Sequence, residues 1–106
     1  MTETYKSFGT IINGTAPVTV YSGVSGSAIV NSINCTNGST LAGIPVTIEA
    51  IKGSTAYLLL YQVPIPINTT LQALDTTLVL EANNTLRVTA GLTYPLHVFV
   101  SVLEVT

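Results

Sequence analysis

The sequence predicts an all-β fold, an antiparallel eight-stranded β-sandwich for which a jelly roll is the favoured topology. Three observations predict it. Apolar and β-branched residues alternate with polar ones at period two along most of the chain, and no segment carries an apolar stripe at helical spacing. Clusters of Gly, Pro, Asn and Ser interrupt this alternation about every 8–12 residues. The 106 residues are enough for one domain with a two-layer core.

In the first half of the chain, four segments have strand character. Residues 5–12 are either a first strand or an extended N-terminal arm. Residues 18–21 form a short extended segment between turns that contain Gly, and residues 28–36 form a longer strand. Residues 46–50 put three apolar side chains on one face and two polar ones on the other, which is typical of a half-buried antiparallel strand.

The second half begins with a tight hairpin predicted at residues 52–54. Residues 56–62 are apolar on both faces, so we expect both faces to be covered. Residues 63–67 contain two prolines, each of which removes a hydrogen-bond donor, so we expect an extended crossover between the sheets. The remaining expected strands are residues 70–74, 77–80, 86–90 and 96–105.

The alternation also predicts which side chains are buried. The expected core is Ile33, Cys35, Ile48, Leu59, Leu80, Leu86, Val88, Val98 and Val100. Tyr57, Tyr61 and Phe99 are expected among the core side chains of the strands, and Tyr94 is the aromatic residue expected in an exposed loop. In domain terms, residues 1–12 are an arm or a first strand, and residues 13–106 are a single sandwich domain. An immunoglobulin-like sandwich is the alternative topology, although its Cys and Trp landmarks are missing.

Composition bears on the class of partner. The chain is 47% hydrophobic but only 8% charged, against roughly 25% in ordinary domains, and therefore lacks the usual protection against association. It is expected to pack against copies of itself or against a partner. Lys6, Lys52 and Arg87 are far apart in sequence, which argues against nucleic acid. No uninterrupted apolar stretch reaches the ~18 residues of a membrane span, so no membrane is expected.

The residues that could carry chemistry are few. His97 is the only histidine and has no evident nucleophile or carboxylate partner in the sequence pattern. Cys35 alternates with Ile33 and is expected to be a buried apolar residue. The five carboxylates are scattered, so no metal site is predicted within one chain. We therefore expect no enzyme, no catalytic residues and no cofactor.

Several stretches together resemble small jelly-roll virion structural proteins of tailed phages. Those families show an "AIVNSIxVTN" strand, a "VPIP" crossover, a "LVLEAGDTLRVTA" hairpin and a "SVLEI" ending. The corresponding stretches are residues 28–37, 57–59, 63–66, 78–90 and 100–105. The chain departs from the pattern at Asn83-Asn84, where the usual hairpin has Gly-Asp, and in the turn at residues 22–26. Asn tolerates the left-handed conformation, so the hairpin is expected to form.

The resemblance implies a capsid decoration (cement) protein that stabilises the coat lattice. The alternative is a tail, neck or fibre-associated module, structural or receptor-binding. A third reading is a β-sandwich binding module outside viruses, such as a sugar-binding domain. The implied partners are the major capsid protein and copies of the chain itself, with a homotrimer favoured because capsid lattices offer many local three-fold sites. The implied location is the virion, assembled in the host cytoplasm, which agrees with an N-terminus that does not read as a signal peptide.

The expected interface lies in the first twelve residues. Tyr5, Phe8, Ile11 and Ile12 are apolar, and as an arm they would have no clear strand partner within their own domain. Such a segment can pair with a strand of a partner. The alternative, that residues 1–12 form an ordinary first strand of the sandwich, stays open at this point.

Overall fold

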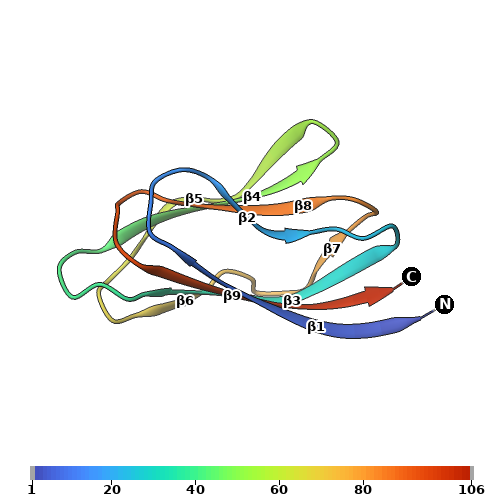
Figure 1. Ribbon diagram of the computed structural model, residues 1–106, viewed down its shortest axis with the longest axis horizontal. Helices are drawn as coiled ribbons and strands as arrows, with labels where there is room; N and C mark the ends of the chain where they lie inside the picture. Colours follow the sequence, from blue (N-terminus) through green and yellow to red (C-terminus); the bar gives the residue numbers. More distant parts are fainter. Residues whose placement is uncertain (1, 106) are drawn as a thin grey trace.

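The structure is a computed structural model that describes residues 2–105. Two antiparallel sheets pack face to face (Figure 1). Strands contain 65% of the described residues. Residues 2–105 contain no helix. The predicted all-β sandwich is therefore confirmed. Both termini lie at the same end of the molecule (Figure 1).

Nine strands form the two sheets. They are β1 (Glu3–Ile12), β2 (Val18–Ser22), β3 (Ser27–Asn37), β4 (Ile44–Lys52), β5 (Thr55–Ile65), β6 (Thr70–Gln72), β7 (Leu78–Leu80), β8 (Thr85–Ala90) and β9 (Leu96–Val105). The first sheet has the order β1-β9-β3-β6, with β7 also paired to β3, and the second has the order β2-β8-β4-β5. The pairs are nested along the chain: β1 with β9, β2 with β8, β3 with β6 and β7, and β4 with β5. This nesting is that of a jelly roll.

The strand count of nine differs from the predicted eight because one strand position is occupied by two short strands. Both β6 and β7 pair antiparallel with the same edge of β3, β6 near its C-terminal end and β7 near its N-terminal end. Residues 73–77 leave the ladder between them, around Asp75-Thr76. The jelly roll thus keeps eight strand positions, and one of them is interrupted.

The core lies between the sheets, on the inward-facing residues of each strand. Eight of the nine residues predicted as core are fully buried. Leu59 is the exception and is only half-buried. The register of β5 against β4 shifts at this point, and Leu59 has no partner on β4. The prediction for Leu59 was wrong because an extra residue in a β-bulge breaks the alternation of faces.

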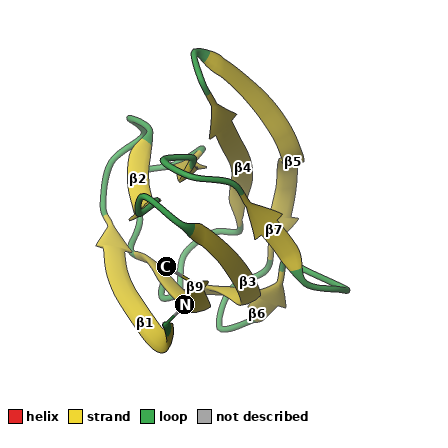
Figure 2. Cartoon of the chain, turned by 90° about the vertical axis from the view of Figure 1, so that its right-hand side faces the viewer, coloured by secondary structure: helices red, strands yellow, loops and turns green. Residues whose placement is uncertain are grey.

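Strand β5 is an edge strand, so the prediction that both its faces are covered was wrong. Tyr57 and Tyr61, expected in the core, are exposed. The β4–β5 hairpin extends beyond the body of the sandwich (Figure 2), where no opposite sheet can cover it. Pro64 is tolerated because one side of an edge strand needs no ladder donor. The crossover predicted at residues 63–67 occurs only after Ile65, where β5 ends.

Two turns have the predicted form. Gly53, between β4 and β5, has a φ of 64°, a conformation that glycine adopts without strain. Asn83, between β7 and β8, has a φ of 65°, which confirms that an asparagine supports the left-handed turn where the related hairpin has glycine.

Candidate functional site

The four predicted interface residues belong to β1, and the structure divides them between the two faces of the first sheet. Residues 3–12 pair with β9 over ten positions without a bulge, so they are a first strand of the sandwich. Ile12 is buried in the core, and Phe8 packs against the core with its ring edge-on to Tyr21 at a centroid distance of 5.3 Å. Tyr5 and Ile11 point to the outer face and are exposed. The four residues therefore do not form one patch.

An apolar row crosses the outer face of the first sheet near the chain termini. Tyr5 lies opposite Leu103, Leu103 lies opposite Ile29, and Ile29 lies opposite Val79, so that four strands each contribute one side chain. Tyr5 is 76% exposed and Val79 is 62% exposed. Exposed apolar side chains gathered on one face make that face a candidate docking surface.

Phe99 adds a second exposed aromatic ring to this outer face. A Cβ placed on Gly9 would lie 3.4 Å from Cδ1 of Phe99, so the ring lies over the glycine. Beside it is a shallow hollow of about 340 Å³, lined in part by Ile11, Asn34 and His97. Phe99 was predicted in the core but is 49% exposed, and Tyr94, predicted to be exposed, is half-buried against the core. We call the apolar row together with Phe99 the docking face.

The outer face of the second sheet is different in character. Thr47 and Thr89 lie opposite each other on β4 and β8, and Glu49 lies opposite Arg87. The Arg87 Nε donates to Glu49 Oε1 at 3.0 Å, an ion pair between neighbouring strands. The β4–β8 part of this face is polar and its charges are paired, whereas β5 adds the exposed Leu58 opposite Glu49. The apolar row of the first sheet crosses four strands, which makes that sheet the stronger candidate for a docking surface.

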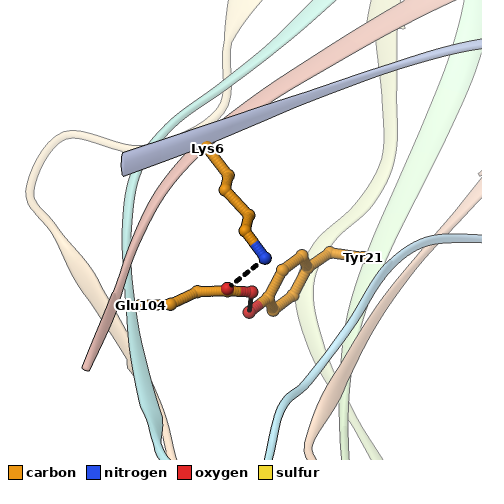
Figure 3. Close-up of polar contacts among 3 residues, drawn as sticks. All are labelled: Lys6, Tyr21 and Glu104. Atoms are coloured by element: carbon orange, nitrogen blue, oxygen red, sulfur yellow. Dashed lines mark hydrogen bonds and ion pairs between the residues drawn. The ribbon is translucent and has the colours of Figure 1, made fainter. Parts of the chain in front are cut away.

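A polar cluster on the inner side of the first sheet attaches β1 to the rest of the sandwich. Glu104 on β9 has a side chain that is only 5% exposed. Tyr21 on β2 donates its hydroxyl proton to Glu104 Oε2 at 2.7 Å, and Lys6 on β1 places its Nζ 2.8 Å from Oε1 (Figure 3). Both carboxylate oxygens are therefore engaged, so the buried charge is compensated.

The cluster shifts the pKa values of its members. The hydrogen bond from Lys6 lowers the pKa of Glu104 below its ordinary value, and the Tyr21 hydroxyl adds to this, while burial opposes it. Burial raises the pKa of Tyr21 well above its usual range, and the hydrogen bond to Glu104 adds to this effect. At neutral pH the cluster thus holds an ionised carboxylate and a neutral phenol.

We expect Glu104→Gln to destabilise the protein by about 1–2 kcal/mol at pH 7, since hydrogen bonds to a charged group contribute about this much and Lys6 is half-exposed. Because the folded-state pKa of Glu104 is lowered, its stabilisation is fully present above the ordinary value of 4.5 and is lost as the pH falls through the folded-state pKa. Urea unfolding from pH 7 downward should show the gap in unfolding free energy between variant and parent closing as the pH falls below the ordinary value of 4.5 and through the lowered pKa of Glu104.

The matched control for that experiment is Glu3→Gln, a change to an exposed carboxylate on the neighbouring strand β1. It should leave the unfolding free energy nearly unchanged at every pH. A gap for Glu104→Gln that stays constant with pH would show that the carboxylate charge is not what stabilises the cluster.

Cys35 and His97, the two residues considered for chemistry, lie in different surroundings. Cys35 is free and buried in the core, and burial raises the pKa of its thiol to about 12. His97 is exposed on the outer face of β9, as predicted for a strand histidine. Within residues 2–105, no three His, Cys, Asp or Glu side chains are grouped so that they could hold a metal ion. The same part of the chain has no helix long and apolar enough to cross a membrane.

Sequence reasoning missed Phe99 and Val79 as surface residues, although a signal was present for Phe99. Leu96, Val98 and Val100 alternate along β9 and are all buried, so the residue between Val98 and Val100 must point to the other face. The apolar row itself could not be found in the same way, because it depends on which strands are neighbours.

Comparison with known proteins yields little. No protein-family model matches the chain, and no curated protein sequence is significantly similar to it. Among solved structures, the chain is similar to the structure of infectious bursal disease virus Gt strain, with 10% sequence identity and a TM-score of 0.47. The match covers 95% of this chain and 31% of that chain, so the chain spans about a third of the length of the protein it matches. A likeness of this extent supports no functional argument.

Proposed function

We propose that this protein is a virion structural protein, and in particular a capsid decoration protein that binds the coat lattice of a tailed phage. The observation that carries the proposal is the docking face, an exposed apolar row with Phe99 four residues away along β9 on the same face, beyond the paired Ser7 and Ser101. Its partner would be the major capsid protein, and its location the assembled particle. In this role the protein contributes contacts and no catalysis.

Two further features support the proposal. The resemblance of residues 28–37 and 78–90 to phage virion proteins concerns strands and turns that form the sandwich. With 8% charged residues, the protein has little electrostatic protection against association, which suits a component that is packed against neighbours. Copies of the chain on neighbouring lattice positions would let individually weak contacts hold firmly.

The test uses shells assembled from the major capsid protein of the phage that carries this chain. Val79→Asp and Phe99→Asp put a charge on the docking face at exposed positions, so folding should be unaffected. We expect at least about tenfold weaker binding, because a charge must then be desolvated against the partner. Binding is measured by co-sedimentation with the shells, and the melting temperature checks the fold.

Tyr57→Asp and Leu58→Asp are the matched controls, since both residues are similarly exposed but belong to β5 of the other sheet. They should bind the shells as the parent does. Equal loss from both sets of variants would mean that general apolarity rather than the docking face drives binding. Full binding by the docking-face variants would overturn the proposal.

The second candidate is a tail or fibre-associated module that recognises a glycan. It is favoured by the exposed ring of Phe99, on which a sugar could stack, next to a hollow lined by the polar side chains of Asn34, Thr36 and His97. Two measurements separate the candidates. A decoration protein occurs in many copies across the lattice and binds bare shells, whereas a receptor-binding module occurs in few copies and binds host cells.

A further inference from the structure

The free edge of β1 is the least protected strand edge in the sandwich. β1 is ten residues long and pairs regularly with β9, and within residues 2–105 nothing pairs with its other edge. An unpaired edge presents a row of backbone donors and acceptors to another strand, and proteins usually block such edges with Pro, bulges, very short strands or charged side chains such as Lys. β1 is ten residues long and has no Pro and no bulge, and its one lysine, Lys6, is held on the inner side by Glu104.

The other edge strands have such protection. β5 carries Pro64, two shifts of register against β4, and Gln62 with a φ of 50°. β2 is five residues long and contains a bulge. β6 and β7 are three residues each. The contrast singles out β1 as the edge that is open to pairing.

We propose that two copies of this protein form a dimer by antiparallel pairing of their β1 strands about a two-fold axis at Phe8. In this register residues 4–12 of each copy overlap. Tyr5 lies opposite the partner's Ile11 on the outer face, and the same pair occurs twice because of the symmetry. Phe8 lies opposite its own copy on the inner face.

The register follows from the side chains of β1. In an antiparallel pair, residues directly opposite each other point to the same face of the sheet. A two-fold axis perpendicular to the sheet meets this condition only if one residue lies opposite its own copy, so few registers are possible. The axis at Phe8 joins the two exposed apolar residues of the strand, Tyr5 and Ile11, as aromatic and β-branched neighbours. An axis at Ser7 leaves Tyr5 opposite Gly9 and Ile11 opposite the charged Glu3.

The charged residues of β1 also favour an axis at Phe8. An axis at Lys6 would place two lysines directly opposite each other, which is unfavourable between paired strands. With the axis at Phe8, Lys6 lies opposite Thr10 of the partner and keeps its contact with Glu104 in its own copy. The only other charged residue of the strand, Glu3, falls outside the overlap.

The dimer adds a second copy of the chain to the proposed function. The purpose of the dimer rests on that function, but the pairing of the β1 strands does not. Pairing through β1 joins the first sheets of the two copies into one continuous sheet, so two docking faces lie side by side on one surface. A homotrimer, the symmetry expected from the resemblance, would need β1 to pair with a different edge of the next copy, and the other edges are protected. The self-pairing can be tested without any capsid protein.

The first measurement is the mass of the purified protein in solution by sedimentation equilibrium or light scattering. We expect twice the 11.1 kDa of one chain at high concentration, with dissociation on dilution. Ile11→Lys should weaken the dimer by about tenfold, since both pairs of Tyr5 with Ile11 are lost and each copy places a charge opposite the partner's Tyr5. Leu41→Lys, which changes an exposed loop residue away from β1, should leave the dimer intact.

The second measurement tests the register. The double variant Tyr5→Cys with Ile11→Cys should form a disulfide-linked dimer on mild oxidation, with peptide mapping that joins position 5 of one copy to position 11 of the other. Within one copy the two positions are about 20 Å apart along the strand, too far for an internal disulfide. The single variants Tyr5→Cys and Ile11→Cys should not cross-link under the same conditions, and neither should Ser7→Cys.

Each result decides the matter. A monomer at all concentrations, a trimer, or single variants that cross-link as fast as the double variant would overturn the proposed dimer. Since Val79 and Phe99 lie outside β1, binding to shells by a monomeric protein would leave the decoration function standing while the dimer fails. A dimer that does not bind shells would leave the β1 pairing standing while the decoration function fails.

Discussion

Leu86→Ala is expected to lower the free energy of unfolding by about 3 kcal/mol, as large-to-small changes in well-packed cores do. Leu86 is fully buried on β8, at the centre of the second sheet, with Tyr21 opposite it on β2 and Ala50 opposite it on β4. The backbone on both sides is fixed by ladder hydrogen bonds, so the surroundings cannot collapse into the cavity. Urea unfolding at pH 7 measures the effect as a lower midpoint with an unchanged slope.

Leu58→Ala is the matched control, because it removes the same atoms from a side chain that is 55% exposed on β5. It should cost less than about half a kcal/mol. If Leu86→Ala were as mild as Leu58→Ala, the inward and outward faces of β8 would be reversed with respect to the structure, since a shift of one residue exchanges the two faces.

The sequence was a good guide to the fold wherever a strand has one buried and one exposed face. On β8 and β9, alternation alone placed Leu86, Val88, Val98 and Val100 correctly in the core. It failed on β5, which is apolar on both faces although it is an edge strand. Periodicity reports which side chains share a face, and only the topology decides whether another sheet covers that face.

The candidate site was harder to predict for the same reason. The contact between Tyr21 and Glu104 joins residues 83 positions apart, and no local pattern signals it. The apolar row needs four strands in a particular order, so Ile29 and Val79 become neighbours only when β7 pairs with β3. Whether the first twelve residues form an arm or a strand stayed open from the sequence, because it depended on β9 as a partner.

Deleting residues 1–8 is expected to unfold the protein, or to lower its melting temperature by well over 10 °C. The deletion removes most of β1 and its pairing with β9 from Glu3 to Phe8. It takes the half-exposed Lys6 away from the buried Glu104, and the loss of a hydrogen bond to a charged group costs about 1–3 kcal/mol. It also takes the ring of Phe8 away from Tyr21.

Losses of this size are a large part of the roughly 5–15 kcal/mol that stabilise a domain, and each kcal/mol shifts the melting temperature by about 4–8 °C in a chain near this length. The control is a chain without residues 1–2, which begins where β1 begins at Glu3 and should melt as the parent does. Thermal unfolding followed by circular dichroism compares the three chains. A chain without residues 1–8 that melts at the parent's temperature would mean that these residues are an accessory arm, and the paired edge, the cluster around Glu104 and the β1 dimer would all have to be abandoned together.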